Sequence, residues 1–287
     1  MKTVNSFDEV RTYISKVRGL RKGFLTNFFP EQKKIDMWTS HECLYVVEGE
    51  ETAIFLKKDD GFTYILYCAT TKEQLLGALA SLPEDTYVFD QIVDARADAS
   101  LLDGFKAMGF EVRKSLVRMS KINETPEPVA DASVYDATKE DIPVLDELLH
   151  EHFDKYAEQL PTIEELNEFV ELKHVIVKRT DDKIAGFIFY DQSPSTLYLR
   201  YWLVNTEFRN QRVGSELFHE YNRRGAACKR HMLWVVEDNE NAIKRYEHYG
   251  YKNEAMKDYV LTKNVNEGGG KILILRRLPF CNYQIAA

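Results

Sequence analysis

The second half of the chain contains a basic turn between an aromatic run and a helix-like segment. The aromatic run ends at Val204, and apolar residues then recur at Val213 and Leu217, as on one face of a helix. Such a strand–loop–helix turn leaves backbone N–H groups free at the helix start, where they and the helix dipole bind phosphate groups. The alternative is a basic surface turn before an ordinary helix. The predicted pyrophosphate site comprises Arg209, Asn210, Gln211, Arg212, Val213, Gly214 and Ser215.

A second motif lies nearer the C-terminus. Ala242, Tyr246 and Gly250 are spaced four residues apart, so they share one helix face, and glycine commonly ends a helix. Tyr251 completes a Gly–aromatic pair. Taken alone, this pattern favours a core-edge aromatic on an amphipathic helix. A short apolar run, Met232–Val236, predicts a strand between the two motifs.

With both motifs present in this order, the second half resembles the GNAT acyltransferase superfamily, whose members acetylate amines from acetyl-CoA. The family's phosphate loop reads Arg/Gln-x-x-Gly-x-Gly/Ala, and the chain matches it at Arg209 and Gly214. Arg212 stands where the family usually has Gly, and it either reaches a phosphate or points to solvent. The second family motif matches at Asn239, Ala242, Tyr246, Gly250 and Tyr251. The resemblance covers roughly residues 132–278.

The resemblance implies acetyl-CoA as co-substrate, direct transfer without an acyl-enzyme, and no metal. It places the thioester at Leu203 and Val204, where two strands splay apart. Tyr246 matches the family's general acid, which protonates the leaving thiolate. Glu237, beside Asp238, is the candidate base through a water molecule. The resemblance also implies that Asn239 contacts the cofactor. Tyr198, Arg200 and Trp202 share one face of the aromatic strand and are expected to line an acceptor groove; the alternative is that they form an exposed or packed strand face.

The chain also repeats itself. Gly109–Phe110 and Gly250–Tyr251 end similar helical patterns 141 residues apart. In each half the sequence predicts a hairpin, then a third strand, a helix and a short strand. The hairpin strands are 44–47 and 52–56 in the first half and 175–178 and 184–190 in the second. The third strands are 62–68 and 196–204, and the short strands after the helices are 87–89 and 232–236. We therefore expect an α/β chain with two GNAT-like three-layer domains, 1–125 and 126–287, joined by the Pro-containing stretch 123–128. Each has a mixed, mostly antiparallel sheet flanked by helices.

The first copy lacks the chemical residues of the second. Phe105 takes the place of Tyr246, and Asp98 takes the place of Asn239. The loop Ala69–Gly77 has no Arg-x-x-x-x-Gly frame and is too short to enclose a pyrophosphate. We therefore expect the first copy to be a degenerate domain without a cofactor site, which serves as a scaffold or as one wall of the acceptor pocket.

Composition sets limits on partners. The 287 residues carry a net charge of −8 with no long basic run, so we expect no nucleic-acid partner. No apolar run reaches the ~20 residues of a membrane span. The four cysteines are too far apart in sequence for a zinc knuckle, which favours a reducing, cytoplasmic location. The expected acceptor is a small-molecule amine or a peptide amine, and the expected state is a monomer or homodimer.

Two other functions fit the same motifs. A CoA-sensing protein would bind without transferring, and Arg212 favours it. A transferase using aminoacyl-tRNA on a tandem GNAT fold is less consistent with the acidic charge and with the CoA motifs.

Overall fold

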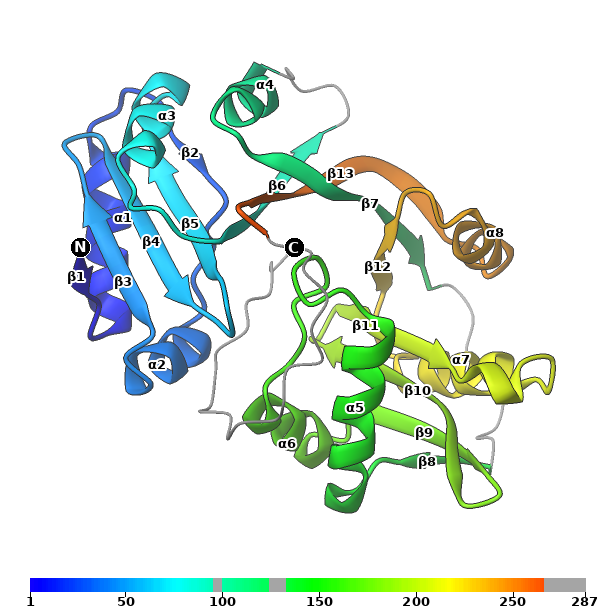
Figure 1. Cartoon of the computed structure of the whole chain (residues 1–287). Coiled ribbons are helices and arrows are strands. Elements are labelled where there is room, and N and C mark those ends of the chain that lie inside the picture. Colours follow the sequence, from blue (N-terminus) through cyan, green and yellow to red (C-terminus); the bar gives the residue numbers. More distant parts are fainter. Residues whose placement is uncertain (95–99, 124–132, 266–287) are drawn as a thin grey trace. The chain divides into compact units, whose positions relative to one another are not determined.

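The computed structural model describes residues 1–94, 100–123 and 133–265, and the chain forms two compact units (Figure 1). Unit 1 comprises Met1–Ser115, Asp154–Thr162 and Asp258–Ala287; unit 2 comprises Leu116–Phe153 and Ile163–Lys257. The compact units thus do not follow one cut in the chain, because β7 and β13 each contribute to both. Asp98, most of the Pro-containing stretch 123–128 and the last part of the range covered by the resemblance, 266–278, lie outside the described residues.

Unit 1 is a mixed sheet with helices on both faces. Its strands follow the order β1-β3-β4-β5-β6-β13, and β2 adds to the end of β5. Phe55 of β4 packs against Tyr13 of α1 on one face, while its neighbours Ile54 and Leu56 join the core under α3 and α4. The elements are β1(Lys2–Thr3), α1(Phe7–Gly19), β2(Leu25–Thr26), α2(Gln32–Ser40), β3(Leu44–Glu48), β4(Thr52–Lys58), β5(Thr63–Ala69), α3(Lys72–Ala80), β6(Tyr87–Asp94), α4(Ser100–Ala107) and β7(Glu111–Ile122).

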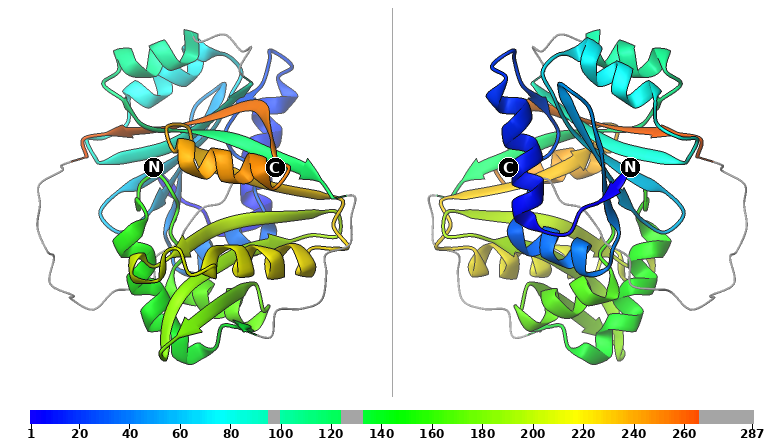
Figure 2. Two further views of the ribbon diagram at one scale, coloured as in Figure 1. Left: turned by 90° about the vertical axis from the view of Figure 1, so that its right-hand side faces the viewer. Right: turned by 90° about the vertical axis from the view of Figure 1, so that its left-hand side faces the viewer.

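Unit 2 repeats this architecture in the order β7-β12-β11-β10-β9-β8. Phe189 of β10 packs against Phe169 of α6, and the other face of the sheet carries α7 and α8. Figure 2 shows α7, in yellow, lying along the strands of unit 2. The elements are β8(Val134–Asp136), η1(Lys139–Asp141), α5(Ile142–His152), α6(Ile163–Glu171), β9(Val175–Thr180), β10(Lys183–Gln192), β11(Thr196–Val204), η2(Thr206–Phe208), α7(Val213–Arg224), β12(Arg230–Val236), α8(Glu240–His248) and β13(Lys252–Lys263).

The repeated order of elements is confirmed. Hairpin, third strand, helix, strand, helix and long strand follow one another as β3–β4–β5–α3–β6–α4–β7 and as β9–β10–β11–α7–β12–α8–β13. Gly109 and Gly250 follow the two repeated helices with φ of 84° and 86°, the left-handed conformation that favours glycine. Helices α2 and α6 were not predicted, since both are short and lie between recognisable elements.

Within the described ranges, no helix is long and apolar enough to cross a membrane. Nor do His, Cys, Asp and Glu side chains gather there in threes that could hold a metal ion.

Candidate active site

The centre of unit 2 is a pair of parallel strands that separate. β11 pairs with β12 from Thr196 to Leu199, opposite Arg230 to Leu233. Beyond that point the described register stops, although β11 continues to Val204 and remains paired to β10. Backbone groups of the unpaired stretch on the β12 side can therefore hydrogen-bond an extended ligand. Leu203 and Val204, the predicted thioester positions, lie at the end of this stretch.

The predicted phosphate loop leads from β11 into α7. Arg209 and Arg212 are exposed, and neither side chain makes a hydrogen bond or ion pair with another described residue. Arg212 has φ 63° and ψ 1°, the left-handed conformation that usually calls for glycine. Asn210 is left-handed too, at φ 64°. Glu216 lies in the first turn of α7, and its Oε2 is 2.5 Å from Nζ of Lys178. The lysine charge offsets the repulsion that the Glu216 carboxylate would exert on an anion at the helix start.

Trp202 connects the loop to the predicted acid. A Cβ on Gly214 would lie 3.4 Å from the Trp202 ring and 3.2 Å from Val204, so glycine lets α7 begin close to β11. The Trp202 ring stacks on Phe218 of α7 at 4.9 Å and lies 5.8 Å from Tyr246 of α8. The structure therefore brings together Val204, Gly214 and Tyr246, which are distant in sequence.

Tyr246 is almost fully buried, at 8% exposed. Burial raises the pKa of its phenol above the ordinary value, and nearby Arg245 opposes this only in part. The phenol is therefore protonated at neutral pH, as a proton donor must be before the reaction.

Two further predicted residues lie at the β12–α8 connection. The Asn239 side chain accepts a hydrogen bond from the Ala242 backbone N–H at 3.2 Å and caps α8. Glu237, 43% exposed, accepts a hydrogen bond from Lys257. The Glu237 carboxylate is therefore already occupied by a donor from β13.

The predicted acceptor trio is divided by a β-bulge. In the pairing of β10 with β11, Phe189 faces Tyr201 and Tyr190 faces Leu199, so Arg200 is an extra residue. Arg200 consequently lies beside Tyr198 and Tyr201, 5.2 and 5.7 Å from their ring centres. Trp202 instead packs on α7 and does not join Arg200. Alternation along an unbroken strand had placed all three on one face.

The corresponding connection in unit 1 is short and its helix is capped by its own side chain. Only two residues separate β5 from α3, and Thr71 caps the helix itself by accepting from the Gln74 N–H at 3.3 Å. Phe105, in the place of Tyr246, is fully buried against Phe89 at 4.9 Å. β5 and β6 pair in the described register only at Thr63–Tyr64, and beyond that point the Asn27 side chain hydrogen-bonds to both strands.

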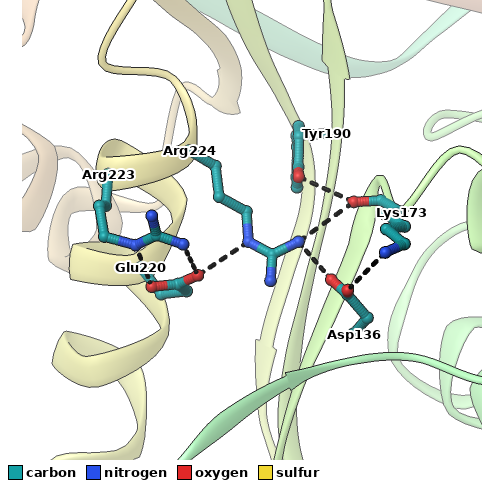
Figure 3. A network of polar contacts seen from close by, with 6 residues as sticks. All are labelled: Asp136, Lys173, Tyr190, Glu220, Arg223 and Arg224. Carbon is teal, nitrogen blue, oxygen red and sulfur yellow. Dashed lines mark hydrogen bonds and ion pairs between the residues drawn. The ribbon is translucent and has the colours of Figure 1, made fainter. Parts of the chain in front are cut away.

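A polar network that the sequence did not reveal holds the far end of α7 (Figure 3). Buried Glu220 accepts from Arg223 twice at 2.7 Å and from Arg224 at 2.9 Å. Arg224 also donates to Asp136 of β8, while the Tyr190 hydroxyl donates to the Lys173 carbonyl at 2.8 Å. The helix that begins at the phosphate loop is thereby fixed to β8 and β10. Only an i, i+4 Glu–Arg pair in α7 hints at this in the sequence.

Comparisons with known proteins agree with this geometry. The sequence model of the Acetyltransferase (GNAT) family matches residues 140–251. A search of curated proteins finds no match. Among solved structures, a tandem GNAT protein from the clavulanic acid biosynthesis pathway is 13% identical, with a TM-score of 0.60 over 91% of this chain and 96% of its own. A GNAT-family acetyltransferase from Colwellia psychrerythraea is 12% identical, with a TM-score of 0.52 over 91% and 97%. The expected fold class, two GNAT-like domains in one chain, is confirmed.

Proposed function

We propose that this chain, in which residues 140–251 form an acetyltransferase domain of the GNAT family, moves an acetyl group from acetyl-CoA to a primary amine in unit 2. The observation that carries the proposal is the separation of β11 from β12. It lies next to the loop 209–215, whose two exposed arginines can bind an anion, and next to the buried Tyr246. Acyl transfer needs a polarised carbonyl and a proton for the leaving group, and the unpaired backbone of β11 and the Tyr246 phenol can supply these.

The pyrophosphate of acetyl-CoA would lie on the start of α7. There the unpaired backbone N–H groups and the helix dipole favour negative charge, and Arg209 and Arg212 can each pair with a phosphate. The pantetheine arm would then extend along the unpaired stretch of β11 toward Leu203 and Val204. This assigns one cofactor site to the second copy, within 126–287, and none to the first, within 1–125.

In the reaction, the neutral amine attacks the thioester carbon, and the C–S bond breaks as the C–N bond forms. As the C–S bond breaks, the sulfur takes the phenolic proton of Tyr246, and the tyrosinate regains a proton from solvent. The amine proton leaves through water to Glu237. Since no side chain forms a bond with the acetyl group, transfer is direct.

Binding without transfer is the second candidate, and the ion pair of Glu237 with Lys257 favours it. The Glu237 carboxylate would have to release Lys257 before it could accept the amine proton. An amine that enters in its neutral form can also lose its proton directly to water after the attack, so transfer does not require Glu237.

Calorimetric titration with acetyl-CoA, followed by a screen of amines for release of free CoA thiol, separates the two candidates. Transfer predicts one acetyl-CoA per chain and thiol release that depends on the amine. One bound acetyl-CoA with no thiol release from any small amine or peptide N-terminus favours the sensing function. No binding would contradict both.

A further inference from the structure

Arg200 has a position that the β-bulge creates. It is the extra residue of β11, and it follows immediately after Leu199, the last residue paired with β12. Its guanidinium lies over Tyr198 and beside Tyr201, whose ring meets Phe153 after α5 at 5.3 Å. The bulge therefore turns a positive charge toward the α5 face of the separated strands, opposite to Trp202 and α7.

This charge is buried and incompletely satisfied. The Arg200 side chain is 9% exposed, and its Nη1 is inaccessible to solvent and has no hydrogen-bond partner among the described residues. The carboxylate of Asp191 lies 3.7 Å from Nη1, too far for a hydrogen bond. A buried guanidinium N–H without an acceptor destabilises the folded protein unless a ligand supplies that acceptor.

An anionic group on a ligand could supply the hydrogen-bond acceptor that Nη1 of Arg200 lacks. Guanidinium binds carboxylates through paired N–H donors, and a site of low polarity strengthens the contact. Arg200 lies four residues before Val204 on the same strand, so an acceptor molecule could reach both positions. Asp191 would balance the charge partly when the site is empty.

We propose that Arg200 binds a carboxylate of the acceptor, so that the substrate is an amine that also carries a carboxylate. This inference rests on the proposed acetyl transfer in unit 2. The acceptor expected from the sequence is an amine, and the inference adds a carboxylate to it. The net negative charge of the chain gives no sign of such an anionic substrate.

Matched acceptors test the inference. Thiol release from acetyl-CoA is measured with 4-aminobutyrate against butylamine and with L-lysine against cadaverine. The expected result is a kcat/KM at least about tenfold higher for the carboxylate member of one or both pairs, as charged hydrogen bonds allow. Arg200→Met should remove this preference mainly by raising KM. Asp191→Asn, which removes the competing carboxylate, should lower KM for the same acceptors.

The controls keep folding and function apart. Without ligand, Arg200→Met should unfold at a temperature no lower than the wild type, because it removes an unsatisfied buried charge, and its acetyl-CoA Kd should match the wild type. Arg200→Lys should keep part of the preference. If Arg200→Met does not fold, Asp191→Asn and Arg200→Lys still decide the matter. Equal kcat/KM within both pairs, in a protein that acetylates amines, overturns the inference alone. If no amine is acetylated, the proposed transfer fails, and calorimetry of 4-aminobutyrate against butylamine with CoA bound then decides whether Arg200 takes a carboxylate.

Discussion

The side-chain amide of Asn27 donates a hydrogen bond to the backbone carbonyl of Asp90, 3.1 Å away and 63 positions along the chain. The same Nδ2 donates to the Ile65 carbonyl at 3.1 Å, and Oδ1 accepts from the Tyr67 N–H at 2.7 Å. One carboxamide thus joins β5 to β6 beyond the point where their pairing ends. In unit 1 an internal amide occupies the kind of gap that unit 2 leaves for a ligand.

Replacing Asn27 by alanine should loosen this closure and expose Cys68. Cys68 lies opposite Thr26 of β2, fully buried, and burial raises the pKa of its thiol to about 12. In a protein whose other cysteines are changed to alanine, we expect Asn27→Ala to speed thiol labelling of Cys68 about 5- to 100-fold, because two buried carbonyls and one buried N–H lose their Asn27 partner.

Asn5→Ala is the matched control, since Asn5 is an exposed amide near the N-terminus. Acetyl-CoA should not change the labelling rate of Cys68 in either variant. Protection of Cys68 by acetyl-CoA would mean that unit 1 also accepts the cofactor.

Arg212→Gly should stabilise the protein by up to about 1 kcal/mol. A left-handed conformation costs a non-glycine residue about 1–2 kcal/mol, and the extra backbone entropy of glycine takes back about 0.5–1. Arg209→Gly is the control in the same loop, where φ is −64° and ψ is 151°, so no strain is relieved and stability should not rise. Urea unfolding measures both variants.

The same two variants test the phosphate contacts. Each removes one exposed cation from the loop, so both should weaken acetyl-CoA binding, by about tenfold in low salt. If Arg212→Gly binds acetyl-CoA with wild-type affinity, the Arg212 side chain does not contact a phosphate. Cofactor binding would then require only the left-handed backbone conformation at this position.

Tyr246→Phe should lower turnover by about 10²–10⁴-fold with little change in acetyl-CoA affinity, since only the proton donor is lost. Tyr249→Phe is the control: its ring stacks on Phe218 at 4.1 Å on the same side of the sheet, and its loss of a hydroxyl should not affect kcat. Equal kcat in Tyr246→Phe and wild type, with chemistry rate-limiting, would exclude Tyr246 as the acid.

The sequence predicted most elements because their signals are local. Gly109 and Gly250 follow helices α4 and α8 in the left-handed conformation, as the spacing of the two Gly–aromatic patterns indicates. What it missed depends on contacts between distant residues. Nothing near Asn27 marks it as a bridge to β6, and no local pattern reveals that Arg200 is the extra residue of a bulge. That bulge is why Trp202 was placed on the wrong face relative to Arg200.

Stability should fall in acid because of His231. Burial lowers the pKa of its imidazole from 6.5 to about 4, the Gly225 carbonyl opposing this and Lys121 adding to it. Between these values the unfolded chain binds a proton that the folded chain does not, so the free energy of unfolding decreases as pH falls from about 6.5 to 4. In urea unfolding at several pH values, His231→Gln should show a smaller slope in this window. An unchanged slope would assign the acid sensitivity to other groups.

The last prediction concerns where unit 2 begins. The second half of β7 pairs with the whole length of β12, from Leu116 opposite Val236 to Ile122 opposite Arg230. A fragment of residues 126–257 lacks β7 and leaves β12 as an unpaired edge next to the candidate site, and such edges promote aggregation. We expect it to be insoluble or unfolded by far-ultraviolet circular dichroism, whereas residues 116–257 should fold and bind acetyl-CoA. If both fragments are equally soluble and bind acetyl-CoA alike, β7 is dispensable and a division near residue 125 describes the functional domain.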